Sequence, residues 1–256
     1  MNAIRGPSAD MLDPVKLFNG RDLDEWTVYP SDLSGKDQTA FAAVDGMLRI
    51  AGGKGDQAHM GWIFTKDSFR NYRLSLHYKW GGPAYGARKE SARSSAVLLH
   101  ASISSSASGS PTAIQVKLME GNSGTVELMS GLAADDQGRP IKPGVTAEAV
   151  QTDSQLSFAA GAPKMRIEES NKPVAWNNRD QAFKDVLGFR GRDDVESPLG
   201  QWTRLDWICR GDNIEIYLNG QLVNRLSEVS PSSGRVGLQS SGAEIWFRNI
   251  ELVPLP

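Results

Sequence analysis

The chain has 256 residues, a formal net charge of −2 and 39% hydrophobic residues, enough to build a sizeable core. So small a net charge provides no electrostatic attraction to nucleic acid or to an anionic membrane surface. No apolar stretch approaches the length that a membrane-spanning helix needs. We therefore expect no nucleic-acid partner and no membrane insertion, and either a globular enzyme or a lectin fits these properties.

The N-terminal residues 1–14 are mixed and polar, without the charged and apolar regions of a signal peptide. We expect them to form a disordered or extended segment, followed by a single domain over residues 15–256. Cys209 is the only cysteine, which excludes an internal disulfide framework and leaves the cellular compartment open. The expected location is cytoplasmic unless a signal sequence has been removed.

The elements that the first third of the chain predicts are short strands. Residues 15–20 open the ordered region with an Asn-Gly turn, and residues 41–50 predict two strands around an Asp-Gly turn. Residues 62–65 predict another strand. Residues 72–80 alternate between apolar and polar side chains, which places the aromatic and leucine side chains on one face.

The middle of the chain predicts two strands and then a long excursion. Strands over residues 95–100 and 113–119 bracket the serine-rich tract 102–110, which we expect to be a flexible surface loop. Residues 133–200 carry scattered proline, glycine and charge, and predict one strand at 165–168 within what is mostly loop. A loop insertion this long is uncommon unless it serves a site.

The last part of the chain determines the predicted fold class. Residues 202–209 and 213–223 alternate on both sides of Asn219-Gly220, the strongest short-range signal for a hairpin turn. Two further alternating runs, 235–240 and 243–253, follow after polar loops. Strands at this density, with no helical period between them, predict an all-β antiparallel sheet folded on itself into a sandwich.

The histidines give no local metal signature, because His59, His77 and His100 are not spaced as a pair of ligands on one element. His100 ends an apolar strand, where side chains leave a core and enter a cleft, and it follows a loop that carries Arg88 and Lys89. A site role and a structural role for His100 are equally compatible with this pattern.

Aromatic and acidic residues point to carbohydrate. Trp80, with Tyr85 close behind it in a polar loop, is a candidate for stacking on a sugar ring, although sandwich cores also absorb large aromatics. Glycoside chemistry needs two carboxylates in different environments, and the candidates are Glu120, Glu127, Asp193, Asp194 and Glu196. The residues alone support a sugar-binding sandwich better than any named reaction.

Three separated motifs then resemble the domain-of-unknown-function 1080 family, also called the 3-keto-disaccharide hydrolase domain. They are residues 17–26 (Leu-Phe-Asn-Gly-Arg-Asp-Leu-x-x-Trp), residues 202–223, and residues 247–250 (Phe-Arg-Asn-Ile). Mid-chain segments over residues 88–100, 120–124 and 188–198 are similar to one branch of that family. The resemblance covers about residues 15–254.

The resemblance implies a concanavalin A-like jelly-roll sandwich of two antiparallel sheets, whose concave sheet forms a carbohydrate cleft. It also implies action on 3-keto-glycosides by elimination of the C1 substituent and hydration of the enone, and an exported location. By this resemblance His100 and Glu120 act as base, acid or ligands of a possible divalent metal ion, and Arg88, Lys89 and Arg93 stabilise the enolate. The substrate would be held by Trp80, Tyr85, Gln115, Lys117, Asp194, Glu196 and Gln239.

The chain departs from the family pattern at several positions. Gln115 stands where the branch usually has glutamate, Lys117 where it has a neutral side chain, and Ser241 where it has an acid or histidine. The serines and alanine of residues 94–96 replace the usual Asn-Ser-Gly. Two hypotheses follow: a hydrolase or lyase acting on 3-keto-glycosides, or a non-catalytic carbohydrate-binding module that keeps the cleft without the chemistry. A structural or protein-interaction sandwich is a third.

Overall fold

The computed structural model describes residues 13–29, 40–104, 110–135, 137–152, 155–176, 180 and 182–256. Within them the regular structure consists of strands and one short 3₁₀ helix, η1 (Gly86–Arg88). The strands are β1 (Val15–Lys16), β2 (Trp26–Tyr29), β3 (Phe41–Val44), β4 (Met47–Ile50), β5 (Gly53–Lys54), β6 (Gln57–Ala58), β7 (Met60–Thr65), β8 (Tyr72–Ala84), β9 (Ser94–Ser102), β10 (Thr112–Met119), β11 (Val126–Met129), β12 (Gly144–Gln151), β13 (Leu156–Phe158), β14 (Lys164–Ile167), β15 (Val174–Trp176), β16 (Thr203–Arg210), β17 (Asn213–Leu218), β18 (Gln221–Ser230), β19 (Arg235–Ser241) and β20 (Ala243–Pro254).

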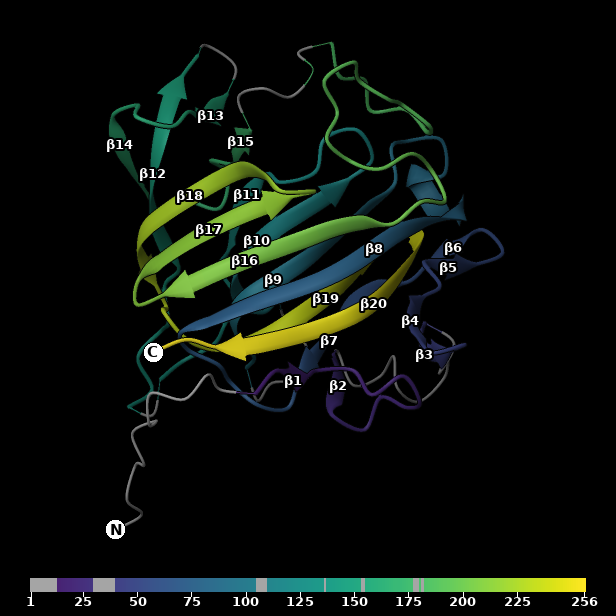
Figure 1. The fold of residues 1–256 in the computed structure, drawn as a ribbon, viewed down its shortest axis with the longest axis horizontal. Helices are drawn as coiled ribbons and strands as arrows, with labels where there is room; N and C mark the ends of the chain where they lie inside the picture. The colour runs from purple at the N-terminus through teal and green to yellow at the C-terminus, as the bar shows by residue number, and fades with distance from the viewer. Residues whose placement is uncertain are drawn as a thin grey trace.

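The strands form two stacked layers (Figure 1). Sheet A has the order β3, β4, β20, β8, β16, β17, β18, β12, β14, with β1 also on β20. Sheet B has the order β2, β7, β19, β9, β10, β11, β15, β13, β12. Every pair is antiparallel except β13 with β15. The predicted all-β sandwich is confirmed, and β12 joins the two sheets at one edge.

The alternation predicted from the sequence determines which side chains form the core of the sandwich. Along β8 the side chains of Leu74, Leu76 and Tyr78 are fully buried between the sheets, and the intervening polar residues face outward. The predicted turns at Asp45-Gly46 and Asn219-Gly220 both have positive φ at each central residue, as a two-residue hairpin turn requires.

The predicted loop insertion over residues 133–200 also contains three strands that the sequence did not indicate. Besides β14 at the predicted place, the segment contains β12, β13 and β15. β12 pairs first with β14 and β18 in sheet A and then with β13 in sheet B. Its side chains are buried on both faces over most of its length, so it lacks the alternation by which a strand is recognised. Residues 1–12 and 105–109, within the predicted N-terminal segment and the serine-rich tract, lie outside the described residues.

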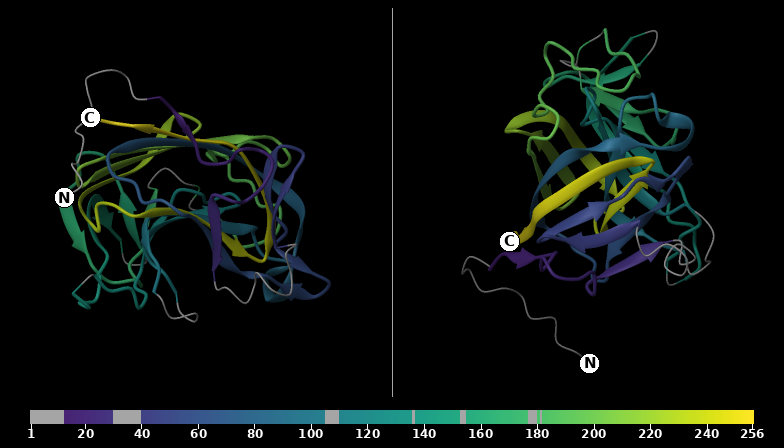
Figure 2. Two further views of the ribbon diagram at one scale, coloured as in Figure 1. Left: turned by 90° about the horizontal axis from the view of Figure 1, so that it is seen from below. Right: turned by 90° about the vertical axis from the view of Figure 1, so that its right-hand side faces the viewer.

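The two layers curve in the same sense, with sheet B on the inner side of the curve (Figure 2, left view). The outer face of sheet B therefore lies on the concave side of the molecule. It carries a second apolar cluster, distinct from the core between the sheets, which includes Tyr29, Phe64, Ala96 and Leu98. No helix among the described residues is long and apolar enough to cross a membrane.

Candidate functional site

A buried ion pair closes one end of the sandwich. Arg93 precedes β9, Glu120 follows β10, and because these strands are neighbours the two side chains meet, with 2.7 Å between Nη1 and Oε1. They are only 6% and 2% exposed. Arg93 also donates to the carbonyl oxygen of Gly82 at 2.7 Å, and Glu120 accepts a hydrogen bond from the amide of Gly188 at 3.1 Å. The pair thus ties the strand ends to the loop over residues 182–200.

Glu196, from the same loop, is the second buried carboxylate at this end. Its Oε1 accepts hydrogen bonds from the Tyr78 hydroxyl and from the Trp80 indole nitrogen, and its Oε2 accepts one from the amide of Gly121 at 2.7 Å. Burial, together with the nearby carboxylate of Asp194, raises the pKa of Glu196 to about 7. The backbone amide of Glu196 in turn donates to Asp194 at 2.9 Å.

The structure therefore brings five of the predicted site residues together, but as a network that holds the loop in place. The charged groups are buried and already have protein partners, so a substrate would have to displace those contacts. Trp80 is 5% exposed, and its indole nitrogen is occupied by Glu196. We call this group the end clamp; its members are Tyr78, Trp80, Arg93, Glu120, Asp194 and Glu196.

The end clamp predicts a pH-dependent stability. A carboxyl whose pKa rises from 4.5 unfolded to about 7 folded stabilises the fold fully below pH 4.5, and that contribution is lost as the pH rises through about 7. One pKa unit corresponds to 1.36 kcal/mol, so the loss is about 3 kcal/mol. Urea unfolding at a series of pH values should show the fall in the free energy of unfolding, and the Glu196→Gln variant should lack it. A difference between wild type and variant that stays constant with pH would contradict this.

His100 lies between the two sheets, away from the concave face. The register of β9 with β10 shifts between Leu99 and Ser102, and His100 has φ of 52°, which is the geometry of a β-bulge. Without the extra residue, the alternation of Ala96 and Leu98 would carry His100 to the outer face of sheet B. The bulge turns the ring inward instead, where it is 1% exposed.

The surroundings of His100 are those of a core histidine. Its Nδ1 donates to the carbonyl oxygen of Pro231 at 2.9 Å, and its ring meets that of Tyr72 edge-on at 5.9 Å. Burial lowers the pKa of His100 to about 4, so the ring is neutral near pH 7. It is also separated from Glu120 by most of the length of β9, on the order of 20 Å at the rise of a strand.

The predicted metal pair is therefore not assembled. Glu120 and His100 lie at opposite ends of β9 and cannot ligate the same ion. No group of three histidine, cysteine or acidic side chains is placed to hold a metal in the part of the chain that the structure describes. Glu120 and His100 therefore do not fit as joint ligands of a divalent metal ion.

Three other predicted residues lie at the surface beside the clamp. Arg88 pairs with Asp185 at 2.9 Å with both side chains more than 40% exposed, and Lys89 is exposed. Tyr85 lies against Gly53 of β5, where an added Cβ would come within 2.6 Å of the Tyr85 side chain. Within the described residues, no hydrogen bond or ion pair joins Arg88, Lys89 or Tyr85 to Glu120 or to His100.

Four polar side chains instead gather on the outer face of sheet B. Gln115 of β10 donates a hydrogen bond from its amide to Gln239 of β19. Lys117, also on β10, forms an ion pair of 2.6 Å with Glu127 of β11, and the two side chains are 31% and 21% exposed. Because β10 pairs Gln115 directly with Glu127, the four side chains form one continuous group, which we call the sheet B patch.

The packing around the sheet B patch explains its shape. β9 runs between β19 and β10, and it presents Ala96 opposite both Gln239 and Lys117. The small side chain leaves room for the two glutamine amides to meet above β9. Trp62 of β7 is the register partner of Gln239 on the other side, and its indole nitrogen is buried without a hydrogen-bond partner. The Trp62 indole, an apolar ring with an unpaired N–H donor, therefore borders the sheet B patch.

The sequence predicted three of the four patch residues as substrate contacts, namely Gln115, Lys117 and Gln239, and did not indicate Trp62. The missed signal is the alternation of β7, in which the buried core residue Ile63 separates Trp62 from Phe64. That pattern places Trp62 on the face opposite the core. Glu127 was one of several acidic candidates, and only the register with Gln115 singles it out.

Comparison with known families gives the class of the protein. A family model described as the 3-keto-alpha-glucoside-1,2-lyase-like domain matches residues 13–253, and the chain belongs to this family. None of the curated proteins matches the chain in sequence.

Several solved structures are similar to this chain. A protein of Parabacteroides distasonis, provisionally described as a glycosyl hydrolase, has a TM-score of 0.53 at 16% identity, over 95% of this chain and 94% of its own. A second protein of that organism with the same description has a TM-score of 0.49 at 18% identity, over 95% and 100%. The carbohydrate-binding module CBM66 of Bacillus subtilis has a TM-score of 0.47 at 12% identity, over 90% and 96%. At these identities the first similarity shows the fold alone, a jelly-roll sandwich.

Proposed function

We propose that the protein binds 3-keto-glycosides at the sheet B patch and removes their C1 substituent by elimination. The observation that carries this proposal is the group of Gln115, Lys117, Glu127 and Gln239 beside Trp62, on the concave side of a family member's curved sheet. Carbohydrate sites combine an aromatic surface with a few placed polar groups, and this patch has both.

The roles follow from the chemistry of the side chains. The C3 ketone acidifies the C2 proton, which the Glu127 carboxylate takes, and the Lys117 ammonium stabilises the enolate oxygen. As the ketone re-forms, the C1–O bond breaks and the leaving oxygen takes up a proton. Water then adds to C1 of the enone and returns a proton to C2, so the net reaction is hydrolysis. The amides of Gln239 and of Gln115, which is 8% exposed, would hydrogen-bond sugar hydroxyls, and Trp62 would pack on the ring.

Incubation with a 3-keto-disaccharide tests the proposal directly. We expect free sugar to appear together with a transient enone absorbance, and the unoxidised disaccharide to remain intact because its C2 proton is not acidic. Release of sugar from both compounds at equal rates would contradict the elimination route. No release from either would remove the catalytic proposal.

The Gln115→Glu variant tests whether the departure from the family pattern limits the rate. Restoring a carboxylate at the register partner of Glu127 should raise kcat/KM by about tenfold, because a second base lies near the C2 proton. Two like charges at directly opposed positions also cost up to about 1 kcal/mol of stability. Steady-state kinetics and urea unfolding measure the two effects. A fall in kcat/KM without loss of folding would show that the amide is the functional group.

A non-catalytic carbohydrate-binding module is the second candidate. The pairing of Gln115 with Gln239 favours it, since two neutral amides recognise hydroxyls without supplying a base. Saturable binding of a 3-keto-disaccharide, with neither sugar release nor exchange of its C2 hydrogen, would favour this function over the lyase.

A further inference from the structure

The outer face of sheet A, on the side of the molecule away from the sheet B patch, carries aromatic and cationic side chains in adjacent positions. The register of β4, β20 and β8 places Trp246 directly between Arg49 and Lys79. Arg49 lies over the Trp246 ring at 5.4 Å and Lys79 at 5.9 Å from its centroid. The row is therefore an indole with a cation on each side.

The next row of the same face is also cationic. His77 of β8 lies between Arg248 of β20 and Arg204 of β16. Asp206 offsets part of this charge, because Arg204 and Arg73 both bind it, at 2.7 and 2.8 Å. Arg248 and Arg204 repel each other across His77, and an anion bound over this row would reduce that repulsion.

Two cations of this face keep uncompensated charge. Within the described residues no carboxylate pairs with Lys79 or Arg248, and both instead lie over the Trp202 ring, at 4.9 and 4.1 Å from its centroid. The nearby carboxylate of Glu244 is already bound by Arg49 at 2.6 Å. An incoming acid group could therefore bind Lys79 or Arg248 without displacing a protein carboxylate.

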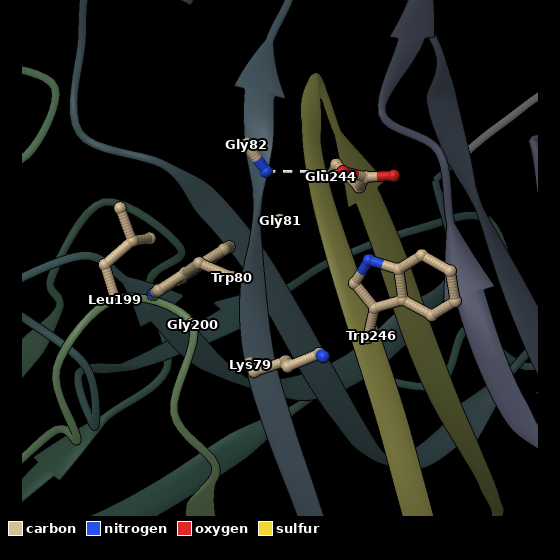
Figure 3. Close-up of a pocket in the computed structure, with 8 residues that line it drawn as sticks. All are labelled: Lys79, Trp80, Gly81, Gly82, Leu199, Gly200, Glu244 and Trp246. Atoms are coloured by element: carbon tan, nitrogen blue, oxygen red, sulfur yellow. Dashed lines mark hydrogen bonds between the residues drawn. The ribbon is translucent and has the colours of Figure 1, made fainter.

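A cavity of about 330 Å³ opens beside this row, lined by Lys79, Trp80, Gly81, Leu199, Glu244 and Trp246 among others. Figure 3 shows the face of the Trp246 indole beside the Lys79 amine, with Leu199 across the cavity. Leu199 is 53% exposed, so the cavity offers apolar surface that no protein group covers. Its volume lies at the lower end of the range for small-molecule sites.

We propose that this outer-face site binds an anionic saccharide, with a sugar ring packed against Trp246 and its acid group on Lys79 and Arg248. Indoles pack well against the C–H face of a sugar, and the two free cations supply charge complementarity for a carboxylate or a sulfate. The site is separate from the sheet B patch and does not depend on the proposed lyase activity. It would hold the protein on an acidic glycan while the other face acts or binds.

Titration calorimetry with a tetragalacturonate, a sulfated tetrasaccharide and a neutral tetrasaccharide tests the proposal. We expect at least one acidic ligand to bind at about 1 mM or tighter, the neutral ligand at least about tenfold more weakly, and added salt to weaken the acidic ligand. The two acidic probes distinguish carboxylate from sulfate recognition. Trp246→Ala and Lys79→Gln should each weaken binding of the acidic ligand about tenfold, which corresponds to a loss of about 1.4 kcal/mol.

Arg225→Gln is the matched control, because it removes one cation from the outer face of sheet A at a position already paired with Glu215. Its binding should equal that of wild type within about twofold, since exposed paired charges contribute little. Equal weakening by all three variants would indicate a diffuse charge effect and overturn the site. Absence of saturable binding by both acidic probes, or equal binding of the neutral one, would also overturn it.

Discussion

Replacing Arg93 by methionine should destabilise the fold by about 3–5 kcal/mol, the usual cost of leaving one member of a buried ion pair without its partner. Glu120 would keep a charge in a place where it is 2% exposed, with only backbone amides to stabilise it. Denaturant unfolding followed by tryptophan fluorescence measures the loss. The Glu120→Gln variant keeps the shape of the side chain but leaves the Arg93 charge buried at 6% exposure, so it should cost a similar amount, about 3–5 kcal/mol.

Arg88→Met is the matched control for this prediction. Arg88 comes from the same loop and also pairs with a carboxylate, Asp185, but both side chains are more than 40% exposed. Its loss should cost no more than about 1 kcal/mol. Similar losses for Arg88→Met and Arg93→Met would mean that burial does not determine the importance of the Arg93 pair.

The fold could be predicted from the sequence where a strand has one face in the core and the other face in solvent. β8, β16, β17 and β20 alternate cleanly, and the turn at Asn219-Gly220 fixes the pairing of β17 with β18. β12 could not be predicted, because it has no solvent-exposed face over most of its length. It passes from one sheet to the other and is buried on both sides, so its sequence lacks the period of two that marks a half-exposed strand.

The site was less predictable, because a single backbone feature reverses a side chain. The period of two carries His100 to the concave face, and the bulge in β9 returns it to the core. A positive φ at a non-glycine residue is not encoded in any local pattern that a strand sequence shows. Gly234 faces this bulge so closely that an added Cβ would lie 2.4 Å from the His100 carbonyl carbon, and that contact is visible only in three dimensions.

The mid-chain motifs that carry the family resemblance turn out to build the end clamp. Glu120-Gly121 and the loop of Gly188 and Glu196 exchange hydrogen bonds in both directions, Gly188 to Glu120 and Gly121 to Glu196. Gly121 has φ of 74°, and an added Cβ would lie 2.8 Å from the Phe189 ring. These motifs are explained by the closure of the sandwich end. Under the proposed function, the chemistry is assigned to the buried or partly buried polar residues of β10, β11 and β19, of which Gln115 and Lys117 depart from the family pattern.

The Glu127→Gln variant should lower kcat/KM for a 3-keto-glycoside by about 10²–10⁴-fold, the range for loss of a general base. Binding of the ketone should persist, because the amide keeps the shape and hydrogen-bonding capacity of the side chain. Stability should change by no more than about 1 kcal/mol, since the pair with Lys117 is partly exposed. Exchange of the C2 hydrogen with solvent deuterium measures the base directly, and a merely structural role would leave that exchange in place.

Glu215→Gln supplies the control for Glu127→Gln, because Glu215 also forms a partly exposed ion pair across neighbouring strands, with Arg225 at 3.0 Å. It lies in sheet A, away from the sheet B patch, so both kcat/KM and deuterium exchange should match wild type. Deuterium exchange retained in Glu127→Gln would assign the proton abstraction to another group. Lys117 is then the remaining titratable side chain of the patch.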